Sequence, residues 1–402
     1  MPPAPQRPSQ SEFVAMMAML FATVALSIDA MLPALPTIAA ELTPLDANRA
    51  QLVVSSLFLG MGIGTLIAGP VSDAIGRKRT ILICAGIYLA GAALCLVAPS
   101  LELLLVARVI QGIGAAGPRS AGTAMVRDLY KGRDMARIIS FVMMIFTLVP
   151  AVAPLVGQTI LLFGGWRLIF AAFIAFAVLV NAWFALRQPE TLPQAARRPL
   201  HLALLWQAAK ELTRHRIALI STLCQSLSLA CLVSTLSSLQ GIFDARFDRA
   251  SSFPLWFAVI AVCAMTGSMV NARVVVRLGM RAVLSGTYAA LLGLSLAVLA
   301  LNLGGLLPLE VEFGLLILWA VGVFGAMGLT MGNLNALAME DLGHIAGFAA
   351  SVIAAASTVI AVLLAVPVGQ AFDGTEIPLL MGGTVFAALA LGLMRFVRRP
   401  AM

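Results

Sequence analysis

The sequence GPVSDAIGRKR, residues 69–79, joins two long apolar runs that occupy residues 51–70 and 80–98. Each run has about the 20 residues that an α-helix needs to cross the hydrocarbon layer of a membrane. The joint itself is short and carries four charged side chains. This stretch therefore predicts two membrane-spanning helices connected by a tight, charged turn.

Five residues of the joint suit such a turn for separate physical reasons. Gly69 permits close contact between helices, and Gly76 supplies a tight turn. Asp73 can accept charge-assisted hydrogen bonds or cap a neighbouring helix start. Arg77 and Lys78 favour the cytoplasmic side of a membrane. A merely solvated turn is the plainer interpretation, but this combination between two spans argues against it.

The composition of the whole chain agrees with a membrane protein. Of 402 residues, 61% are hydrophobic and 11% are charged, whereas soluble domains average about 25% charged residues. The length leaves room for twelve crossings and little soluble domain. The five cysteines lie in apolar segments without clustering, so neither a disulfide frame nor a metal site is indicated.

Twelve apolar segments are long enough to span the hydrocarbon layer. They occupy residues 14–31 (continuing to about residue 38), 51–70, 80–98, 101–126, 138–163, 167–186, 217–240, 253–272, 282–303, 313–334, 345–372 and 378–396. Residues 1–12 are polar and rich in proline, and the first apolar run lacks a small-residue cleavage site. We therefore expect that run to be retained as a helix rather than removed as a signal peptide.

The basic residues predict the orientation. With both termini in the cytoplasm, the inner loops contain twenty of the 26 Lys and Arg residues and the outer loops contain four. This distribution is the positive-inside pattern, here expected for a bacterial-type cytoplasmic membrane. Topology therefore explains the formal charge of +8 without a nucleic-acid partner.

The longest connection, residues 187–216, is polar and contains three prolines. We interpret it as a cytoplasmic linker between two six-helix halves, residues 1–186 and 217–402. GPVSD at residues 69–73 has an echo in GSMVN at residues 267–271, 198 residues later, which indicates internal duplication. Repeated halves around a site near the membrane midplane are typical of transporters.

Asp29, in the stretch VALSIDAMLPALP of residues 24–36, is the one acidic residue well within a predicted span. A charge at the bilayer centre costs on the order of 3 kcal/mol, so such residues face protein or a water-filled path and usually have a function. The plainer interpretation is an Asp that caps the helix kink at Pro33. The predicted spans contain no histidine, so we expect Asp29 to carry the coupling proton.

The joint at residues 69–79 resembles the signature loop of the major facilitator superfamily, G-x-L-x-D-R-x-G-R-K/R, with Ala74 in place of the usual Arg. The resemblance implies an all-α membrane protein with twelve transmembrane helices in two pseudo-symmetric six-helix bundles. It also implies a role in conformational switching for Gly69, Asp73, Gly76, Arg77 and Lys78.

Further stretches resemble the drug:proton antiporter branch of that superfamily. LLVARVIQGIGAA, residues 104–116, is similar to the fourth-helix motif, an intramembrane Arg followed by Gln-Gly. The spacing of Asp29 and Pro33 resembles the first-span motif. LGHIAG, residues 342–347, resembles exporters of the bicyclomycin- and chloramphenicol-resistance type.

In the fifth span, PAVAPLVGQ, residues 150–158, resembles a weakened form of the antiporter motif G-P-x-x-G-G. The expected helix-packing motif consists of Pro150, Ala153, Pro154 and Gly157, with Ala153 in place of the motif's first Gly. Pro154 and Gly157 would bend the helix and let another backbone approach, as a moving interface needs. An ordinary proline-kinked span explains the stretch equally well.

Two arginines, Arg108 and Arg119, lie in the fourth span. At 1.5 Å per residue, Arg108 is about 10 Å and Arg119 about 27 Å from the outer end. Asp29 lies at a depth similar to Arg108, so the antiparallel first and fourth helices could bring these two together. For Arg119, extension of the side chain to the inner surface is the plainer interpretation.

Polar residues of the seventh span recur with helical spacing. Ser221, Gln225, Ser228, Thr235 and Ser238 form one stripe, which we expect to face a central cavity or a neighbouring helix. Hydroxyl groups that bond to their own helix are the plainer interpretation for each serine alone. The residues that we expect to line the substrate cavity are Gln111, Gln225, Ser228, Thr235 and Phe324.

Together these features predict a proton-coupled antiporter that exports lipophilic drugs or related small molecules by alternating access. Burial would favour the neutral form of Asp29 and the charge of Arg108 the ionised form. Export of a sugar, amino acid or siderophore by the same cycle is the alternative. A membrane-embedded enzyme or a passive channel is disfavoured, because the sequence contains neither a cluster of catalytic groups nor rings of repeated charges.

No phosphate-binding loop of the G-x-x-x-x-G-K-S/T type occurs, so the proton gradient is the expected source of energy. We expect no cofactor, no metal and no nucleic acid. The expected partners are protons, a lipophilic small molecule and the lipid bilayer, and the protein is expected to act as a monomer.

Overall fold

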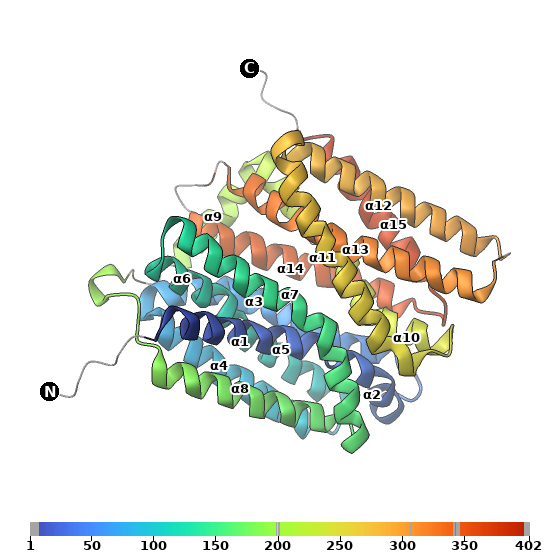
Figure 1. The fold of residues 1–402 in the computed structure, drawn as a ribbon, viewed down its shortest axis with the longest axis horizontal. Coiled ribbons are helices and arrows are strands. Elements are labelled where there is room, and N and C mark those ends of the chain that lie inside the picture. The colour runs from blue at the N-terminus through green and yellow to red at the C-terminus, as the bar shows by residue number, and fades with distance from the viewer. Residues whose placement is uncertain are drawn as a thin grey trace.

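The computed structural model describes residues 8–197, 199, 202–305, 307–340, 342 and 346–397. Over these residues the regular structure is helical, and twelve helical segments are long and apolar enough to cross a membrane (Figure 1). The prediction of an all-α protein with twelve spans is confirmed.

The first six spans are built from α1 (Gln10–Asp29), η1 (Leu32–Ala34), α2 (Leu35–Leu42), η2 (Ala47–Gln51), α3 (Leu52–Ile75), α4 (Arg77–Leu96), α5 (Leu101–Gly117), η3 (Pro118–Gly122), α6 (Thr123–Leu129), α7 (Gly132–Phe163) and α8 (Arg167–Arg187). Two of these spans are interrupted. The first breaks between α1 and η1, and the fourth passes through a π-helical turn, η3, between α5 and α6.

The remaining chain contains η4 (Gln194–Ala196), α9 (Leu202–Arg214), α10 (Arg216–Ala245), η5 (Ala250–Ser252), α11 (Phe253–Leu278), α12 (Met280–Leu303), α13 (Leu309–Met339), α14 (Ala346–Gln370) and α15 (Ile377–Met394). Several helices continue past the apolar run that predicted them; α13, for example, begins at Leu309 and ends at Met339 rather than at residues 313 and 334. Polar residues at the membrane surface can remain helical because helices satisfy their own backbone groups.

The connection between the sixth and seventh spans contains a helix, α9, that the sequence analysis treated as plain linker. Its apolar face packs Ala208 and Leu212 against Ala338 and Val352 of the last six spans. Trp206 lies on the opposite face and is 75% exposed. The helix is short and amphipathic, so it lacks the long apolar run by which the spans were recognised.

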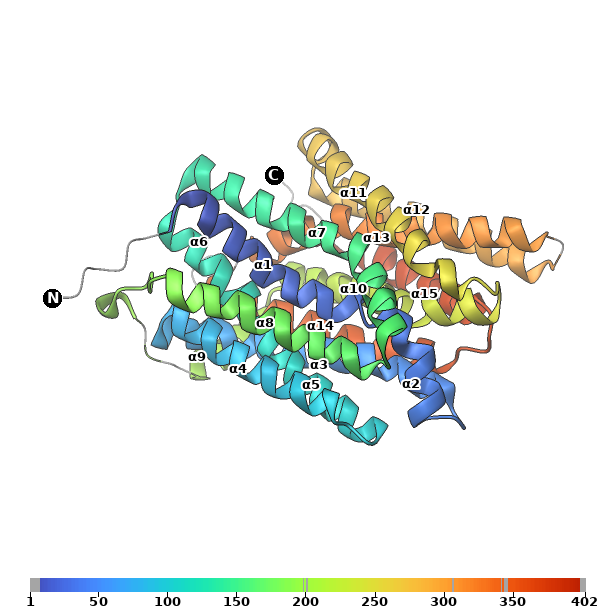
Figure 2. The same ribbon diagram turned by 60° about the horizontal axis from the view of Figure 1, so that its bottom comes forward.

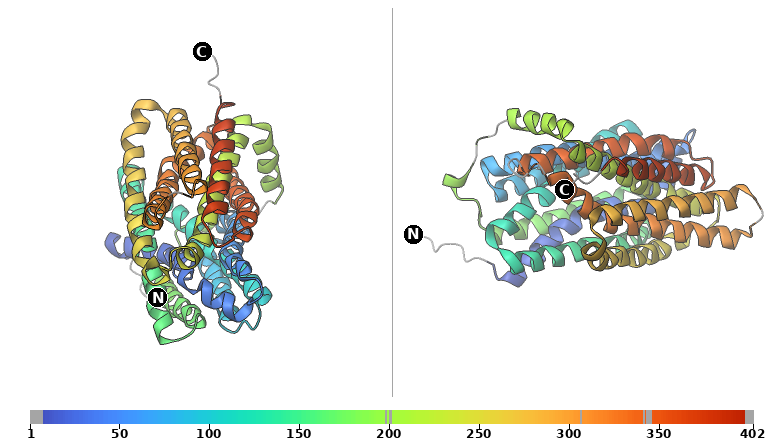
Figure 3. Two further views of the ribbon diagram at one scale, coloured as in Figure 1. Left: turned by 90° about the vertical axis from the view of Figure 1, so that its right-hand side faces the viewer. Right: turned by 90° about the horizontal axis from the view of Figure 1, so that it is seen from above.

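The two groups of six spans lie side by side with their helices roughly parallel to the long axis. Seen end-on, the blue-to-green helices lie below the yellow-to-red ones (Figure 3, left). Figure 2 brings the first group forward, from α7 through α1 and α8 to α4 and α5. The division into two halves with a linker stays an interpretation, which this arrangement supports.

Small residues let the helices within each group approach closely. A Cβ atom added at Gly60 of α3 would lie 2.1 Å from the carbonyl oxygen of Val109 in α5. In the second group, a Cβ at Gly267 of α11 would lie 2.2 Å from the carbonyl oxygen of Gly325 in α13. Such contacts are the usual means by which membrane helices pack without a hydrophobic driving force.

The sequence echo between Gly69 and Gly267 is not an equivalence in space. Gly267 packs on a helix of its own group, whereas Gly69 faces Ser351 of α14 in the other group. The turn glycines Gly76 and Gly279 have φ of 112° and 80°. Each lies at the junction between the second and third spans of its own group. They are 203 residues apart, so the 198-residue offset between the echoes was wrong by about a turn of helix.

Hydrogen bonds between the two groups gather at one end of the molecule, which we call the outer end after the predicted orientation. There Asn48 donates to the carbonyl oxygens of Gln370 and Phe372, at 3.1 and 2.7 Å. Ser238 of α10 donates to Gln51, at 3.0 Å. These bonds hold the two groups together on that side.

Candidate functional site

Asp29 is the last residue of α1, where the first span breaks. Pro33 lies in the first turn of η1 and lacks a backbone N–H, which explains the interruption. Asp29 is 4% exposed. Among the described residues, no hydrogen bond or ion pair reaches its side chain, so the capping interpretation has no contact to support it.

This setting makes the charged form of Asp29 costly. A buried carboxylate without a partner loses its hydration and gains nothing in return. The C-terminal end of a helix also carries partial negative charge, which disfavours an anion there.

Arg108 of α5 is 0% exposed and joins four helices. Its Nη2 donates to the carbonyl oxygen of Ser27 in α1, at 3.1 Å, and its Nε to that of Val53 in α3, at 3.2 Å. Its Nη1 donates to Gln111, at 2.8 Å, and the guanidinium lies 5.8 Å from the ring centre of Phe170 in α8. The carbonyl of Ser27 is near a helix end, where carbonyls lack intrahelical partners and cations are favoured.

The expected pairing of Asp29 with Arg108 is not seen. Arg108 reaches α1 only two residues before Asp29, as the depth estimate suggested, but its guanidinium is taken up by neutral oxygens. Backbone carbonyls leave no trace in a sequence pattern. The sequence therefore predicted the correct helix and the wrong acceptor.

A hydrogen bond between a serine and a tyrosine hydroxyl lies beside Arg108, and a similar one lies in the second group of spans. Ser27 of α1 shares a hydrogen bond with Tyr88 of α4, and Ser228 of α10 shares one with Tyr288 of α12, at 2.7 Å. The serines are 201 residues apart and the tyrosines 200 residues apart. The first and third spans of each group are thus joined by the same contact.

The proline and glycine stretch of the fifth span lies against the break in the first. Pro150 and Pro154 are inside α7, and Ala153 is buried. A Cβ at Gly157 would lie 1.9 Å from the carbonyl oxygen of Ala30, the residue after Asp29. One residue further along α7, Gln158 donates to the carbonyl of Ser251 in the other group, at 3.1 Å.

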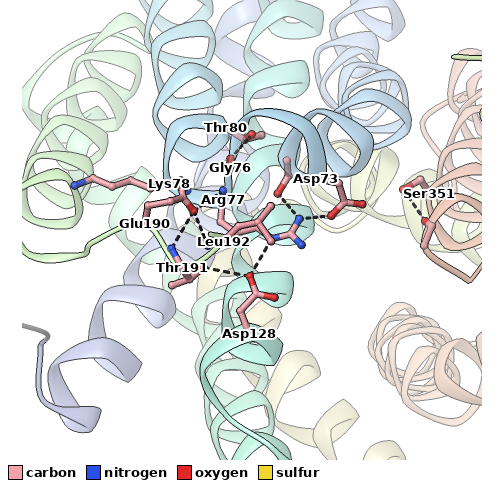
Figure 4. Close-up of polar contacts among 12 residues, drawn as sticks. Asp73, Gly76, Arg77, Lys78, Thr80, Asp128, Glu190, Thr191, Leu192 and Ser351 are labelled. Carbon is pink, nitrogen blue, oxygen red and sulfur yellow. Dashed lines mark hydrogen bonds and ion pairs between the residues drawn. The ribbon is translucent and has the colours of Figure 1, made fainter. Parts of the chain in front are cut away.

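The charged joint between α3 and α4 forms a connected network at the inner end (Figure 4). The Arg77 guanidinium contacts Asp73, Ser72 at 2.9 Å, and Asp128 of α6 at 3.1 Å. Lys78 donates to the carbonyl of Ala185 in α8, at 2.7 Å. This network ties the second, third, fourth and sixth spans together.

Glu190, in the connection after α8, is part of this network and was not singled out from the sequence. Its carboxylate accepts the backbone N–H groups of Arg77, at 2.8 Å, and Lys78, at 3.2 Å. Those N–H groups begin α4, where a carboxylate is favoured by unsatisfied donors and the helix dipole. A capping residue 113 positions away in the chain gives no local signal.

Within the joint, the Asp73 carboxylate makes a local contact rather than one with the other group. Its partner is Arg77, one turn away on the same segment. The approach to the other group is made instead by Gly69, where a Cβ would lie 2.6 Å from Oγ of Ser351. Figure 4 shows Ser351 apart from the Arg77 network.

The residues expected to line one cavity have several different neighbours. Gln225 contacts Ser357 of α14 at 3.1 Å, and Ser228 contacts Tyr288. Thr235 is 0% exposed and donates to the carbonyl of Cys231 in its own helix, as the plainer interpretation expects. Phe324 packs edge-on against Phe257. The polar stripe of α10 therefore does not face a single space.

Two amides of this set remain candidates for substrate contact. Gln111 and Gln225 lie on the fourth and seventh spans, one from each group, and both are buried. The Nε2 atom of Gln225 has no hydrogen-bond partner in the structure. A buried donor without a partner is costly and is available to a ligand.

Arg119 lies in the π-helical turn η3 and its side chain is exposed. Gly117, two residues earlier, packs on Cys84 of α4, and Gly122 faces Phe21 of α1. π-Helical turns often accompany functional positions.

Of the LGHIAG stretch, residues 343–345 lie outside the described residues; Leu342 is buried in the cluster that contains Ala208 and Leu212 of α9, and the carbonyl of Gly347 accepts a hydrogen bond from Ser351.

Comparison with known proteins places this arrangement in a family context. The family model described as Major Facilitator Superfamily matches residues 17–366. The uncharacterized MFS-type transporter YdgK of Bacillus subtilis is 28% identical over 382 residues, which cover 92% of this chain and 91% of that protein. A bicyclomycin resistance protein homolog of Haemophilus influenzae is 26% identical, covering 97% and 96%.

A chloramphenicol resistance protein of Pseudomonas aeruginosa is 28% identical and covers 80% of this chain and 75% of that protein. Among solved structures, the xylose transporter XylE of E. coli superposes with a TM-score of 0.75 at 14% identity, covering 98% of this chain and 99% of that one. At this identity, the similarity to XylE concerns the fold alone.

Proposed function

The chain belongs to the Major Facilitator Superfamily, and we propose that this multi-pass membrane transporter exports lipophilic small molecules from the cytoplasm in exchange for protons. The observation that carries the proposal is Asp29, a buried carboxyl group without a partner at the break of the first span. We propose that the protein is a monomer in a bacterial-type cytoplasmic membrane, with both termini in the cytoplasm.

The class of substrate is taken from the relatives. Proteins named for resistance to bicyclomycin and to chloramphenicol match most of this chain. The buried amides of Gln111 and Gln225 would supply hydrogen bonds to the polar groups of such a substrate. Apolar side chains such as Phe324 would supply adaptable contact surface.

The mechanism follows from the surroundings of Asp29. When the site opens to the outside, a proton from the periplasm neutralises Asp29 and the substrate leaves. Neutral Asp29 is compatible with the dry, close contact between Ala30 and Gly157. When the site opens to the cytoplasm, water allows the proton to dissociate from Asp29. Substrate binding to the ionised form favours this release of the proton.

The first prediction concerns Asp29 itself. Asp29→Asn keeps the shape of the side chain but cannot exchange a proton. In proteoliposomes with an imposed pH gradient, uphill transport of chloramphenicol should fall at least about tenfold, corresponding to roughly 1.4 kcal/mol of lost coupling. Binding of the same compound should survive and lose its pH dependence.

Asp46→Asn is the matched control, because Asp46 lies exposed in an outer loop and undergoes the same chemical change. It should transport like the wild type. Full pH-driven transport by Asp29→Asn would refute Asp29 as the carrier. Transport that runs only downhill in the wild type would refute the antiport itself.

A further inference from the structure

A second group of ionisable side chains lies at the outer end, far along the chain from Asp29. Arg246 follows α10, Glu312 is in the first turn of α13, and Glu376 directly precedes α15. The Glu312 and Glu376 side chains are 5% and 3% exposed, whereas that of Arg246 is 38% exposed. Two buried carboxyl groups thus share one cation that reaches solvent.

The two carboxyl groups are not served equally. Nη2 of Arg246 lies 2.6 Å from Glu312, a strong charged hydrogen bond. Nε of Arg246 lies 3.9 Å from Oε2 of Glu376, which is too far for a hydrogen bond. Oε2 of Glu376 is buried and has no hydrogen-bond partner in the structure. This oxygen is aimed at the cluster and is left without a donor.

Among the residues that the structure describes, no other cation near Glu376 is free to compensate its charge. Arg249, the next basic residue along the chain, is held by Glu310 at 2.7 Å and lies over the ring of Phe313. Asp373, before α15, adds a further negative charge, and hydrogen bonds from Thr375 hold the pKa of Asp373 below its usual range. The outer parts of α12 and α14, which also pack on α15, contain no charged residue over 291–303 and 359–370.

With both glutamates ionised, the cluster would carry one uncompensated negative charge in a buried place. Burial raises the pKa of Glu376, a hydrogen bond from its own backbone and the charge of Arg246 lower it, and the charges of Glu312 and Asp373 raise it. Like charges that share a site raise the pKa of one of the two groups.

We propose that Glu376, with Glu312 and Arg246, forms a proton-binding site at the outer end that is separate from Asp29. The proton resides on Oε2 of Glu376 and exchanges with the outer solution past the exposed side of Arg246. Arg246 ends α10, and α10 also carries Ser238, which bonds to Gln51 of the other group. Occupancy of the site therefore acts on the helix that links the two groups on the outer side.

The test is infrared pH titration of the purified full-length protein with ¹³C-labelled glutamate, which leaves Asp29 unlabelled. The wild type should show a labelled carboxylic-acid C=O band that persists well above the usual glutamate pKa. Glu376→Gln should remove this band. Glu310→Gln is the matched control, since Glu310 is 73% exposed and ion-paired at the surface; it should keep the band.

A second variant guards against misfolding of the first. Glu312→Gln removes the competing charge and leaves Arg246 to Glu376, so the titration midpoint of the band should move down by about one pH unit or more. A wild-type band that titrates like an exposed glutamate, or a band that disappears in Glu312→Gln and remains in Glu376→Gln, would overturn the assignment. Transport is not the readout, so failure of the export function would not affect the result.

Discussion

At the level of single residues, Arg108 shows how an intramembrane charge can be retained without an ionic partner. Its donors are divided among the Ser27 and Val53 carbonyls and the Gln111 side chain. The rigid guanidinium fork suits such divided acceptors, whereas a lysine ammonium is a compact point charge. The arrangement favours a positioning role, in which Arg108 holds the end of α1 in place.

Arg108→Lys distinguishes a positioning role, which depends on the hydrogen-bond geometry of the guanidinium, from a role that depends on positive charge alone. If hydrogen-bond geometry matters, the lysine variant should lose about 2 kcal/mol or more of stability and transport poorly, because buried acceptors lose their donors. If charge alone matters, lysine should preserve both. The measurements are the thermal unfolding midpoint in detergent and pH-driven transport.

Arg49→Lys is the control for this exchange, because Arg49 forms an exposed surface pair with Glu102. It should change stability by less than about 1 kcal/mol. A lysine at position 108 with wild-type stability and transport would contradict the positioning role.

Single residues were predicted from the sequence where their chemistry is out of place, and missed where it is ordinary. Asp29 and Arg108 stand out because charges are rare in apolar runs. Glu190 and Glu376 lie in polar connections and do not stand out, although Glu190 binds the start of α4 and Glu376 lies 3.9 Å from Arg246, both distant in the chain. Partners that are backbone atoms cannot be read from residue types at all.

At the level of helices, the closest contact of the candidate site is between α7 and the break of the first span. Gly157 has no room for a side chain beside Ala30. Any motion that opens the site around Asp29 must slide or part these two segments. The glycine is therefore expected to matter for its missing side chain rather than for backbone freedom.

Gly157→Ala tests this contact. Alanine normally stabilises a helix interior by about 1 kcal/mol relative to glycine. Here its Cβ would lie 1.9 Å from a carbonyl oxygen, so we expect transport to fall several-fold and stability to drop. Transport must be compared at equal amounts of protein in the membrane.

Gly293→Ala in α12 is the matched control, because nothing lies within 4 Å of the added Cβ. It should be neutral or slightly stabilising. Equal behaviour of the two variants would mean that α7 does not restrain the break. Ala153→Gly, one turn earlier in α7, should have the smaller effect of the two changes in this helix.

The spans themselves were predictable, since twelve long apolar runs can do little else in a membrane. Their ends were not, because helices continue into polar surface residues. The amphipathic α9 was missed because its apolar face is completed by residues of distant helices, among them α10, α13 and α14. The break in the first span was indicated by Pro33, whereas the break in the fourth, which begins at Pro118, was not predicted.

At the level of the whole molecule, the two groups meet along α3 and α14 and along α7 and α11. Near the inner end, α3 and α14 approach each other closely at Gly69, which faces the hydroxyl of Ser351. The predicted switch loop thus touches the other group through its glycine and not through Asp73. Both groups must move past this point if the inner side opens and closes.

Gly69→Ala should slow the conformational cycle, because the new Cβ would lie 2.6 Å from Oγ of Ser351. Ser351→Ala removes that oxygen, and its own Cβ stays at an ordinary 3.8 Å. The double variant should therefore recover most of the transport rate, which is measured in proteoliposomes under a pH gradient. A double variant as slow as Gly69→Ala would show that the two residues do not interact.

The repeated serine–tyrosine contact has an electrical consequence. The offset of 201 residues that relates Ser27 to Ser228 relates Asp29 to Ala230, a buried apolar residue. The serine–tyrosine contact is present in both groups of spans, whereas the acidic residue is present in only one. With Asp29 as the single carrier within the membrane, each export of an uncharged molecule would move one positive charge inward. The cycle would then draw on membrane voltage as well as on pH, at about 2.3 kcal/mol per 100 mV, and turnover would register as a current.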